Sequence, residues 1–167
     1  MAISAKMRPS TVKNQKTSKT KSVLVLNGPN LTLLGTREPK LYGKETLAQI
    51  NRRLEATARV AGVRLTCFQS NHEGVLVDRI QQAQRDGVGF IILNPAGYSY
   101  SSVAMRDALT GVQIPFIEVH LSNIHAREPW RAQTHFTAVA VGSVLGLGSQ
   151  GYELALDYAI AQLNARS

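Results

Sequence analysis

The segment NGPNLTLLGTREPKLYG, residues 27–43, places an arginine and a tyrosine where they could act on one proton. Arg37 and Tyr42 are five residues apart, in a stretch rich in glycine, proline and asparagine that is typical of a loop. A free tyrosine has a pKa of about 10, so it can serve as a base near neutral pH only beside a cation that stabilises the phenolate. Arg37 is permanently charged and could be that cation. A packing role for Tyr42 is the alternative that the sequence leaves open.

The segment PFIEVHL, residues 115–121, offers a second acid–base group. His120 can give or take a proton near neutral pH, and Glu118 lies two residues earlier, on the same face of an expected strand. The carboxylate could orient the imidazole or stabilise its charge. The alternative is a histidine whose hydrogen bonds are satisfied within the core. Arg127 and Arg131 follow this segment, and their charge favours an anionic substrate.

Other chemistries lack their sequence signals. The chain has no G-x-G-x-x-G after its first expected strand, no G-x-x-x-x-G-K-[ST] phosphate loop and no G-x-S-x-G nucleophile motif. The spacing of His120 and His125 is poor for a metal site. Lys40 and Lys44, the only lysines after residue 21, both fall in the opening loop, where no core would desolvate an amine for covalent catalysis. We therefore expect acid–base chemistry that needs neither metal nor cofactor.

The positive charge of the chain is concentrated at its amino terminus. The 167 residues carry a formal net charge of +8, and the first 21 contain six basic side chains and no acidic one. Because this segment is rich in Ser and Thr and poor in large apolar residues, we expect residues 1–21 to form a disordered basic extension. It lacks the interleaved aromatic residues of a stacking surface, so a nucleic-acid partner is not expected. Residues 22–167 are long enough to bury one core and are expected to form a single catalytic domain.

The composition gives no sign of a membrane or of export. No apolar run approaches the roughly 18 residues of a membrane span, and the amino-terminal segment lacks the apolar stretch of a secretory signal. The single cysteine, Cys67, excludes an intrachain disulfide and is expected to be a small buried hydrophobe within the run VRLTCFQ. We therefore expect a cytoplasmic protein without a membrane partner.

Apolar runs alternate with helical repeats along residues 22–165. We expect strands at 23–27, 63–69, 88–94, 115–121 and, rich in glycine, near 140–148. This alternation is typical of right-handed βαβ units around a parallel sheet. The pattern predicts an α/β fold, a flavodoxin-like three-layer sandwich with a five-stranded sheet of order 2-1-3-4-5.

Capping signals and apolar spacing predict the helices. Two capping boxes begin the first two helices, and a serine caps a third helix that runs through Ala108; the residues concerned are Thr46 with Gln49, Ser70 with Glu73, and Ser101 or Ser102. The positions expected to face inward are Leu47, Ile50, Leu54 and Ala58, then Val75, Leu76, Ile80 and Ala83, and, in a last helix over 150–165, Leu154, Tyr158 and Ala161.

Polar residues gather where the ligand site of such a fold is expected. In an open sheet of this order, ligands bind beyond the carboxyl ends of strands 1, 3 and 4, which are neighbours at the switch point. These three ends carry Asn27 and Asn30, Asn94, and Glu118, His120 and Ser122. Because polar side chains that follow apolar strands need partners, the pattern predicts a ligand site at this edge of the sheet.

Four motifs in this order resemble the type II 3-dehydroquinate dehydratases: NGPNLTLLGTREPKLYG, NPAGYSYSSVAMRDAL, IEVHLSNIHAREPWR and GLGSQGYELAL. The similarity covers residues 22–165. It implies a flavodoxin-like fold, assembly as a dodecamer of four trimers, and a lyase that dehydrates 3-dehydroquinate to 3-dehydroshikimate. The reaction belongs to the shikimate pathway of aromatic amino acid biosynthesis or to quinate catabolism, and it uses no metal or cofactor.

The resemblance also implies catalytic roles. Tyr42 would remove the C2 proton, and Arg37 would lower the pKa of Tyr42 and stabilise the transition state. Asn30 would hold a water or donor against the enolate oxygen. His120 would protonate the departing C1 hydroxyl, with Glu118 supporting it.

Further residues would bind the substrate. The resemblance assigns this role to Asn94, Leu121, Ser122 and Arg131, with the Leu121 and Ser122 amides taking the carboxylate. Asp107 would reach the site of a neighbouring subunit, and Arg127 would help to close the site.

One position departs from the family pattern. The family usually has a histidine between two small hydroxyl residues, where this chain has Tyr100 between Ser99 and Ser101. A tyrosine can still donate and accept a hydrogen bond, but it is larger and cannot become a cation. The departure and the basic tail keep two other functions open, an inactive relative that binds a small acid and a nucleic-acid binder that uses residues 1–21.

Overall fold

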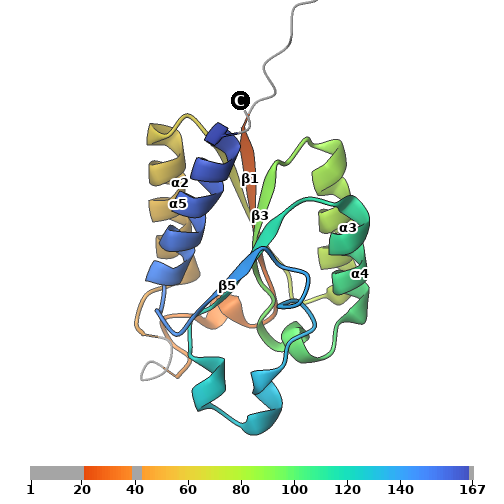
Figure 1. The fold of residues 1–167 in the computed structure, drawn as a ribbon. Coiled ribbons are helices and arrows are strands. Elements are labelled where there is room, and N and C mark those ends of the chain that lie inside the picture. Colours follow the sequence, from red (N-terminus) through yellow and green to blue (C-terminus); the bar gives the residue numbers. More distant parts are fainter. Residues whose placement is uncertain (1–20, 39–42, 166–167) are drawn as a thin grey trace, which may run out of the picture.

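The computed structural model describes residues 21–38 and 43–165 and places five parallel strands in the order β2-β1-β3-β4-β5 (Figure 1). The strands are β1 (Ser22–Asn27), β2 (Arg64–Gln69), β3 (Phe90–Asn94), β4 (Phe116–His120) and β5 (Gly142–Leu145). This confirms the flavodoxin-like order predicted from the sequence. The fifth strand is shorter than expected, because the chain turns at Gly146 with a φ of 79°.

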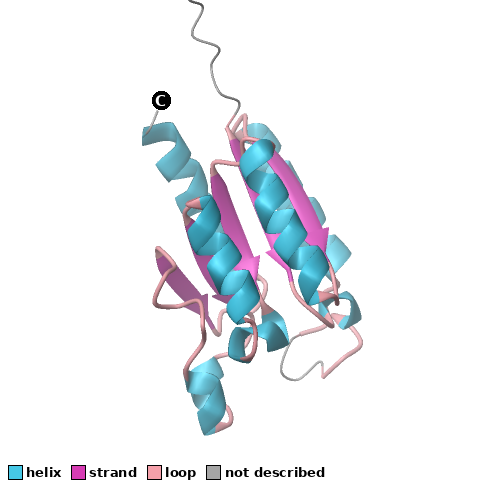
Figure 2. Cartoon of the chain, turned by 90° about the vertical axis from the view of Figure 1, so that its right-hand side faces the viewer, coloured by secondary structure: helices cyan, strands magenta, loops and turns pink. Residues whose placement is uncertain are grey.

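Two pairs of helices cover the sheet. The helices are α2 (Leu47–Val60), α3 (Glu73–Arg85), α4 (Val103–Val112) and α5 (Gln150–Ala165). Helices α2 and α5 lie on one face, and α3 and α4 lie on the other, which is the face that Figure 2 shows. None of the helices in the described part of the chain is long and apolar enough to cross a membrane.

Alternation along the central strands builds a core on each face. Val23 and Val25 pack into the cluster beneath α2 and α5, whereas Leu24 and Leu26 pack into the cluster beneath α3 and α4. Both sets are fully buried, as expected for a parallel sheet that helices cover on both sides. Cys67 is only partly buried and packs against the first cluster.

Local capping explains where α2 begins. The Thr46 hydroxyl accepts a hydrogen bond from the Gln49 amide, and the Thr46 amide donates to Gln49 Oε1 at 2.8 Å. This is the predicted capping box, and the four predicted inward residues of α2 are buried.

The second predicted capping box is wrong. The N-cap of α3 is His72, and Ser70 Oγ instead accepts a hydrogen bond from the His72 amide at 3.0 Å. The helix therefore begins two residues later than the pattern implied, and Val75 is exposed rather than buried. Leu76 and its predicted partners Ile80 and Ala83 do face the core.

The predicted inward face of α5 is also wrong. Leu154, Tyr158 and Ala161 are exposed, and the buried face consists of Tyr152, Ala155, Leu156, Ala159 and Leu163. Small residues let this helix approach the sheet, since a Cβ at Gly151 would lie 3.3 Å from Val144. The helix therefore packs through a face that combines small residues with Tyr152, Leu156 and Leu163, and because the other side also carries Leu154 and Tyr158, the sequence alone does not distinguish the two faces.

Helix α4 has the predicted serine cap and a later end. Ser102 Oγ accepts a hydrogen bond from the Met105 amide at 3.0 Å, so Ser102 is the cap of the two serines proposed. The helix continues past Ala108 to Val112 and stops at Gln113, which has a left-handed φ of 56°.

In the described residues, four short 3-10 helices lie at the carboxyl end of the sheet, where the strand arrows end in Figure 1. They are η1 (Leu31–Leu33), η2 (Ala96–Tyr100), η3 (Ile124–Ala126) and η4 (Pro129–Ala132). The register pairs Asn27 with Asn94 at the last positions of β1 and β3. The 3-10 helices and the polar strand ends therefore share one edge of the fold.

The expected disordered extension lies outside the described residues except for Lys21. The Lys21 Nζ donates a hydrogen bond to Asn164 Oδ1 at 2.7 Å, which places the start of β1 beside the end of α5.

Candidate active site

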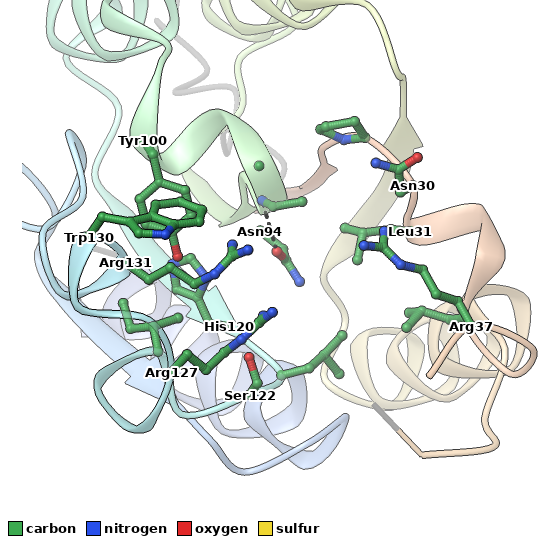
Figure 3. A pocket seen from close by; sticks show the side chains of 16 residues that line it. Asn30, Leu31, Arg37, Asn94, Tyr100, His120, Ser122, Arg127, Trp130 and Arg131 are labelled. Atoms are coloured by element: carbon green, nitrogen blue, oxygen red, sulfur yellow. Dashed lines mark hydrogen bonds between the residues drawn. The ribbon is translucent and has the colours of Figure 1, made fainter. Parts of the chain in front are cut away.

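A cavity of about 290 Å³ opens at the carboxyl ends of β3 and β4 (Figure 3). Its lining includes Asn30, Leu31, Arg37, Asn94, Tyr100, His120, Leu121, Ser122, Arg127, Trp130 and Arg131. These residues and Ile124, which also lines the cavity, come from β3, β4, the 3-10 helices η1 to η4 and the loops beside them. The cavity therefore lies at the switch point where the sequence predicts a ligand site.

His120 lines the cavity and is paired with a buried carboxylate that does not. Glu118 is fully buried and His120 is 6% exposed, and His120 Nε2 lies 2.8 Å from Glu118 Oε1. The two residues are neighbours on one face of β4, so the period of the strand creates the contact. Glu118 therefore lies within hydrogen-bonding distance of His120, where it could orient the ring.

Glu118 remains ionised despite its burial. Burial raises the pKa of this carboxyl, but hydrogen bonds from His120 and Thr137 outweigh it, and the net pKa lies below its usual value. An ionised carboxylate can only accept hydrogen bonds, so His120 Nε2 must carry the proton between them. The other ring nitrogen, Nδ1, is then the one available to a ligand.

Asn94 is fixed by a buried polar network. Its Nδ2 donates to the Tyr152 hydroxyl at 2.8 Å, and that hydroxyl donates to Asn27 Oδ1 at 2.5 Å. The Ala96 amide donates to Asn94 Oδ1 at 3.2 Å. Burial raises the pKa of Tyr152, so the hydroxyl stays protonated. Helix α5 therefore positions the cavity residue Asn94 through the Tyr152 hydroxyl, which also binds Asn27.

Arginines give the cavity a positive field. Arg127 and Arg131 lie on one wall and Arg37 lies across from them (Figure 3). Arg131 Nε donates to Glu128 Oε2 at 2.8 Å, while Arg127 Nε lies 3.5 Å from the same oxygen. No aspartate or glutamate is present among the described residues that line the cavity. Its chemistry favours a small anion.

The unusual Tyr100 belongs to an aromatic wall. Its ring meets Trp130 edge-on at 4.9 Å between centroids, and the Arg131 guanidinium lies 4.0 Å from the Trp130 centroid. These contacts are typical of edge-to-face and cation–π packing. Burial raises the pKa of Tyr100, which Arg131 only partly opposes, so Tyr100 lines the cavity as a neutral donor or acceptor.

The structure gathers most of the predicted site residues. Those that line the cavity are Asn30, Arg37, Asn94, Tyr100, His120, Leu121, Ser122, Arg127 and Arg131. Asn30 has a left-handed φ of 66°, and its amide donates to Asn71 Oδ1 at 3.0 Å, which fixes the turn after β1.

Three predicted residues are not among the described residues that line the cavity. Glu118 is buried and contacts the cavity residue His120. Tyr42 lies outside the described residues. Asp107 is on α4, where its side chain is 67% exposed and borders a separate hollow with α3.

The structure adds three residues that the sequence reasoning missed. Trp130 forms a cavity wall, Tyr152 holds Asn94, and Thr137 contacts Glu118. Only Tyr152 carried a signal, since a tyrosine that is buried in a helix needs a hydrogen-bond partner for its hydroxyl, although the sequence does not say which of Tyr152 and Tyr158 is the buried one. The other two depend on contacts between distant segments, which periodicity does not encode.

Known proteins are similar to this chain in sequence. The family model for class II dehydroquinases matches residues 21–160. A 3-dehydroquinate dehydratase 1 of Ralstonia nicotianae is 61% identical over 141 residues, which are 84% of this chain and 90% of that protein. A 3-dehydroquinate dehydratase of Chromobacterium violaceum is 53% identical over 156 residues, 93% of this chain and all of that protein (100%).

The structural likeness agrees with the sequence. The crystal structure of a type II dehydroquinase from Butyrivibrio crossotus matches with a TM-score of 0.82 and 39% identity, over 84% of this chain and 97% of that one. The matches extend along nearly all of the described residues, including every strand end that forms the cavity. The chain therefore belongs to the class II dehydroquinase family.

Proposed function

We propose that this chain is a hydro-lyase that dehydrates 3-dehydroquinate to 3-dehydroshikimate. The observation that carries the proposal is the His120–Glu118 pair, 2.8 Å apart, whose imidazole lines a cavity that is also lined by three arginines. Relatives that match most of the chain bear the name of this activity. The step would serve the shikimate pathway of aromatic amino acid biosynthesis or quinate catabolism, in the cytoplasm, with residues 22–167 as the catalytic unit.

The positive wall would bind the carboxylate of the substrate. Arg131 is held in place by Glu128 and Trp130, so its orientation is set before a ligand arrives. Amides at Leu121 and Ser122 would take the carboxylate, and Asn94 would bind a ring hydroxyl. Arg127 would help to close the site.

His120 would act as the acid. Because Nε2 is engaged with Glu118, Nδ1 would deliver the proton to the C1 hydroxyl as the C1–O bond breaks and water leaves. The Glu118 carboxylate would stabilise the imidazolium that supplies this proton.

Tyr42 would act as the base on the opposite side. Its phenolate, stabilised by Arg37, would take the C2 proton, and the electrons of that bond would form an enolate. Asn30 would hold a water or donor against the enolate oxygen. Collapse of the enolate with departure of the hydroxyl from the other face would leave the C1–C2 double bond, an anti elimination without metal or cofactor.

Asp107 gives a reason for an oligomer. It lies on α4 beside a hollow separate from the cavity, so within one chain it would not meet the same substrate. We therefore propose that Asp107 completes the site of a neighbouring subunit within a trimer, and that four trimers form a dodecamer.

The direct test is conversion of 3-dehydroquinate by the purified protein. We expect an enone absorbance to grow in the near ultraviolet at a rate proportional to protein concentration. A His120→Ala variant prepared in parallel should lose about 10²-fold or more of this rate, the usual weight of a general acid. If the wild-type protein produces no enone above the uncatalysed rate, the proposed function is wrong.

Removal of the Tyr42 hydroxyl tests the base. We expect Tyr42→Phe to lower kcat about 10³-fold because no group remains to take the C2 proton. Binding of substrate, measured by calorimetry, should change by less than about 3-fold, since the hydroxyl acts mainly in the transition state.

Tyr158→Phe is the matched control, because Tyr158 is exposed on α5 away from the cavity. It should leave kcat unchanged. A Tyr42→Phe protein that loses binding as much as turnover would show that Tyr42 is structural.

Replacement of the unusual tyrosine tests the aromatic wall. We expect Tyr100→His to change KM by about 3- to 10-fold with kcat within about 2-fold, because the cavity wall changes and the acid–base groups do not. Tyr100→Phe separates the ring from the hydroxyl, since it keeps the contact with Trp130. Steady-state kinetics that give Tyr100→His the wild-type KM would show that this position is neutral.

A further inference from the structure

One oxygen of the buried carboxylate is not used by His120. Glu118 Oε2 accepts a hydrogen bond from Thr137 Oγ1 at 2.6 Å, and Ser143 Oγ lies farther away at 3.5 Å. Thr137 belongs to the segment between η4 and β5 and is itself exposed. It is not among the described residues that line the cavity. The catalytic carboxylate is therefore held from outside the cavity.

The direction of these hydrogen bonds follows from a count of protons. An ionised Glu118 offers no proton, so the single hydroxyl proton of Thr137 must be donated to Oε2. Thr134 Oγ1 lies 2.8 Å from Thr137 Oγ1 and must therefore be the donor in that contact. Thr134 Oγ1 in turn accepts from the backbone amides of Phe136 and Thr137 at 3.2 and 3.1 Å. Each hydrogen bond in this series therefore donates in the direction of the Glu118 carboxylate.

The segment that supplies these hydroxyls is anchored. Phe136 is fully buried in the core beneath α3 and α4, and its carbonyl accepts from the Val139 and Ala140 amides at 2.9 Å each. The Val141 amide donates to the Phe116 carbonyl at 2.8 Å, which fixes the segment to the start of β4. The Thr137 hydroxyl is thus fixed before substrate binds.

We propose that Thr137, supported by Thr134, is a positioning residue that keeps Glu118 ionised and oriented toward His120. The inference rests on the proposed function, because it assumes that His120 supplies a proton to the leaving hydroxyl. The lowered pKa of Glu118 agrees with it, since the Thr137 hydrogen bond is one of the causes that offset burial. Without this donor, the burial of Glu118 favours its neutral form, which supports the imidazolium less well.

Kinetics of three variants test the proposal. We expect Thr137→Val to lower kcat about 10-fold, the effect of losing a hydrogen bond to a charged group. KM should stay within about 2-fold because Thr137 touches no part of the cavity. Thr137→Ser keeps the hydroxyl and should retain most of the wild-type kcat. Thr66→Val, the same change at an exposed position of β2, is the matched control and should behave as wild type.

A titration that requires no turnover tests the same contact. The ¹³C signal of the Glu118 carboxyl, assigned by its loss in Glu118→Gln, should titrate at higher pH in Thr137→Val than in the wild type. His120 and Tyr100 are the titratable groups that interact with Glu118 and are unchanged in this comparison. Thr134→Val breaks the chain one step earlier and should shift the titration in the same direction, which provides a second variant if Thr137→Val does not fold.

The outcomes separate the two proposals. A wild-type protein that does not dehydrate 3-dehydroquinate contradicts the proposed function, whatever the titration shows. An active wild type with unchanged kcat and unchanged Glu118 titration in Thr137→Val overturns the role of Thr137 alone. A kcat loss that Thr137→Ser fails to rescue would also overturn it, because the hydroxyl would then not be the group that matters.

Discussion

The charge of Glu118 is the constraint on which the site depends. A fully buried carboxylate is costly unless hydrogen bonds replace the water that it loses. Here one oxygen is bound by His120 and the other by Thr137, at 2.8 and 2.6 Å. Removal of either partner would leave the buried charge partly unpaired, which is strongly destabilising. The site therefore has to keep both hydrogen bonds to Glu118. The His120 imidazole, which lines the cavity, therefore has a carboxylate of fixed position as its hydrogen-bond partner.

The strand order of the fold brings the residues of the site together. Strand order brings the ends of β1, β3 and β4 together, so short polar side chains reach one cavity from segments far apart in the sequence. Tyr152 of α5 bridges Asn27 and Asn94 and thereby links the covering helix to the cavity. The negative charge of Glu118 is buried outside the cavity, whereas the positive charges of the arginines line it. The cavity is therefore suited to an anion, and His120 lies where it could protonate a group of that anion.

The sequence predicted the parts of the structure that periodicity and strand ends encode. Strand order and the positions of Asn94, Glu118 and His120 follow from apolar runs that end in polar residues. The predicted inward face of α5 was wrong because large side chains occur on both sides of this helix, and the side that also carries Gly151, Ala155 and Ala159 packs on the sheet. The Ser70 cap was wrong because a hydroxyl can bind a nearby amide without starting a helix. Thr137 and Trp130 depend on tertiary contacts that no local pattern reports.

The most direct measurement is steady-state kinetics of Glu118→Gln, which keeps the shape of the side chain and removes its charge. If the carboxylate sustains the acid at His120, kcat falls about 10²-fold while KM changes by less than about 3-fold. A folded Glu118→Gln protein with the kcat of the wild type would contradict this account, because the pair would then serve only the stability of the fold.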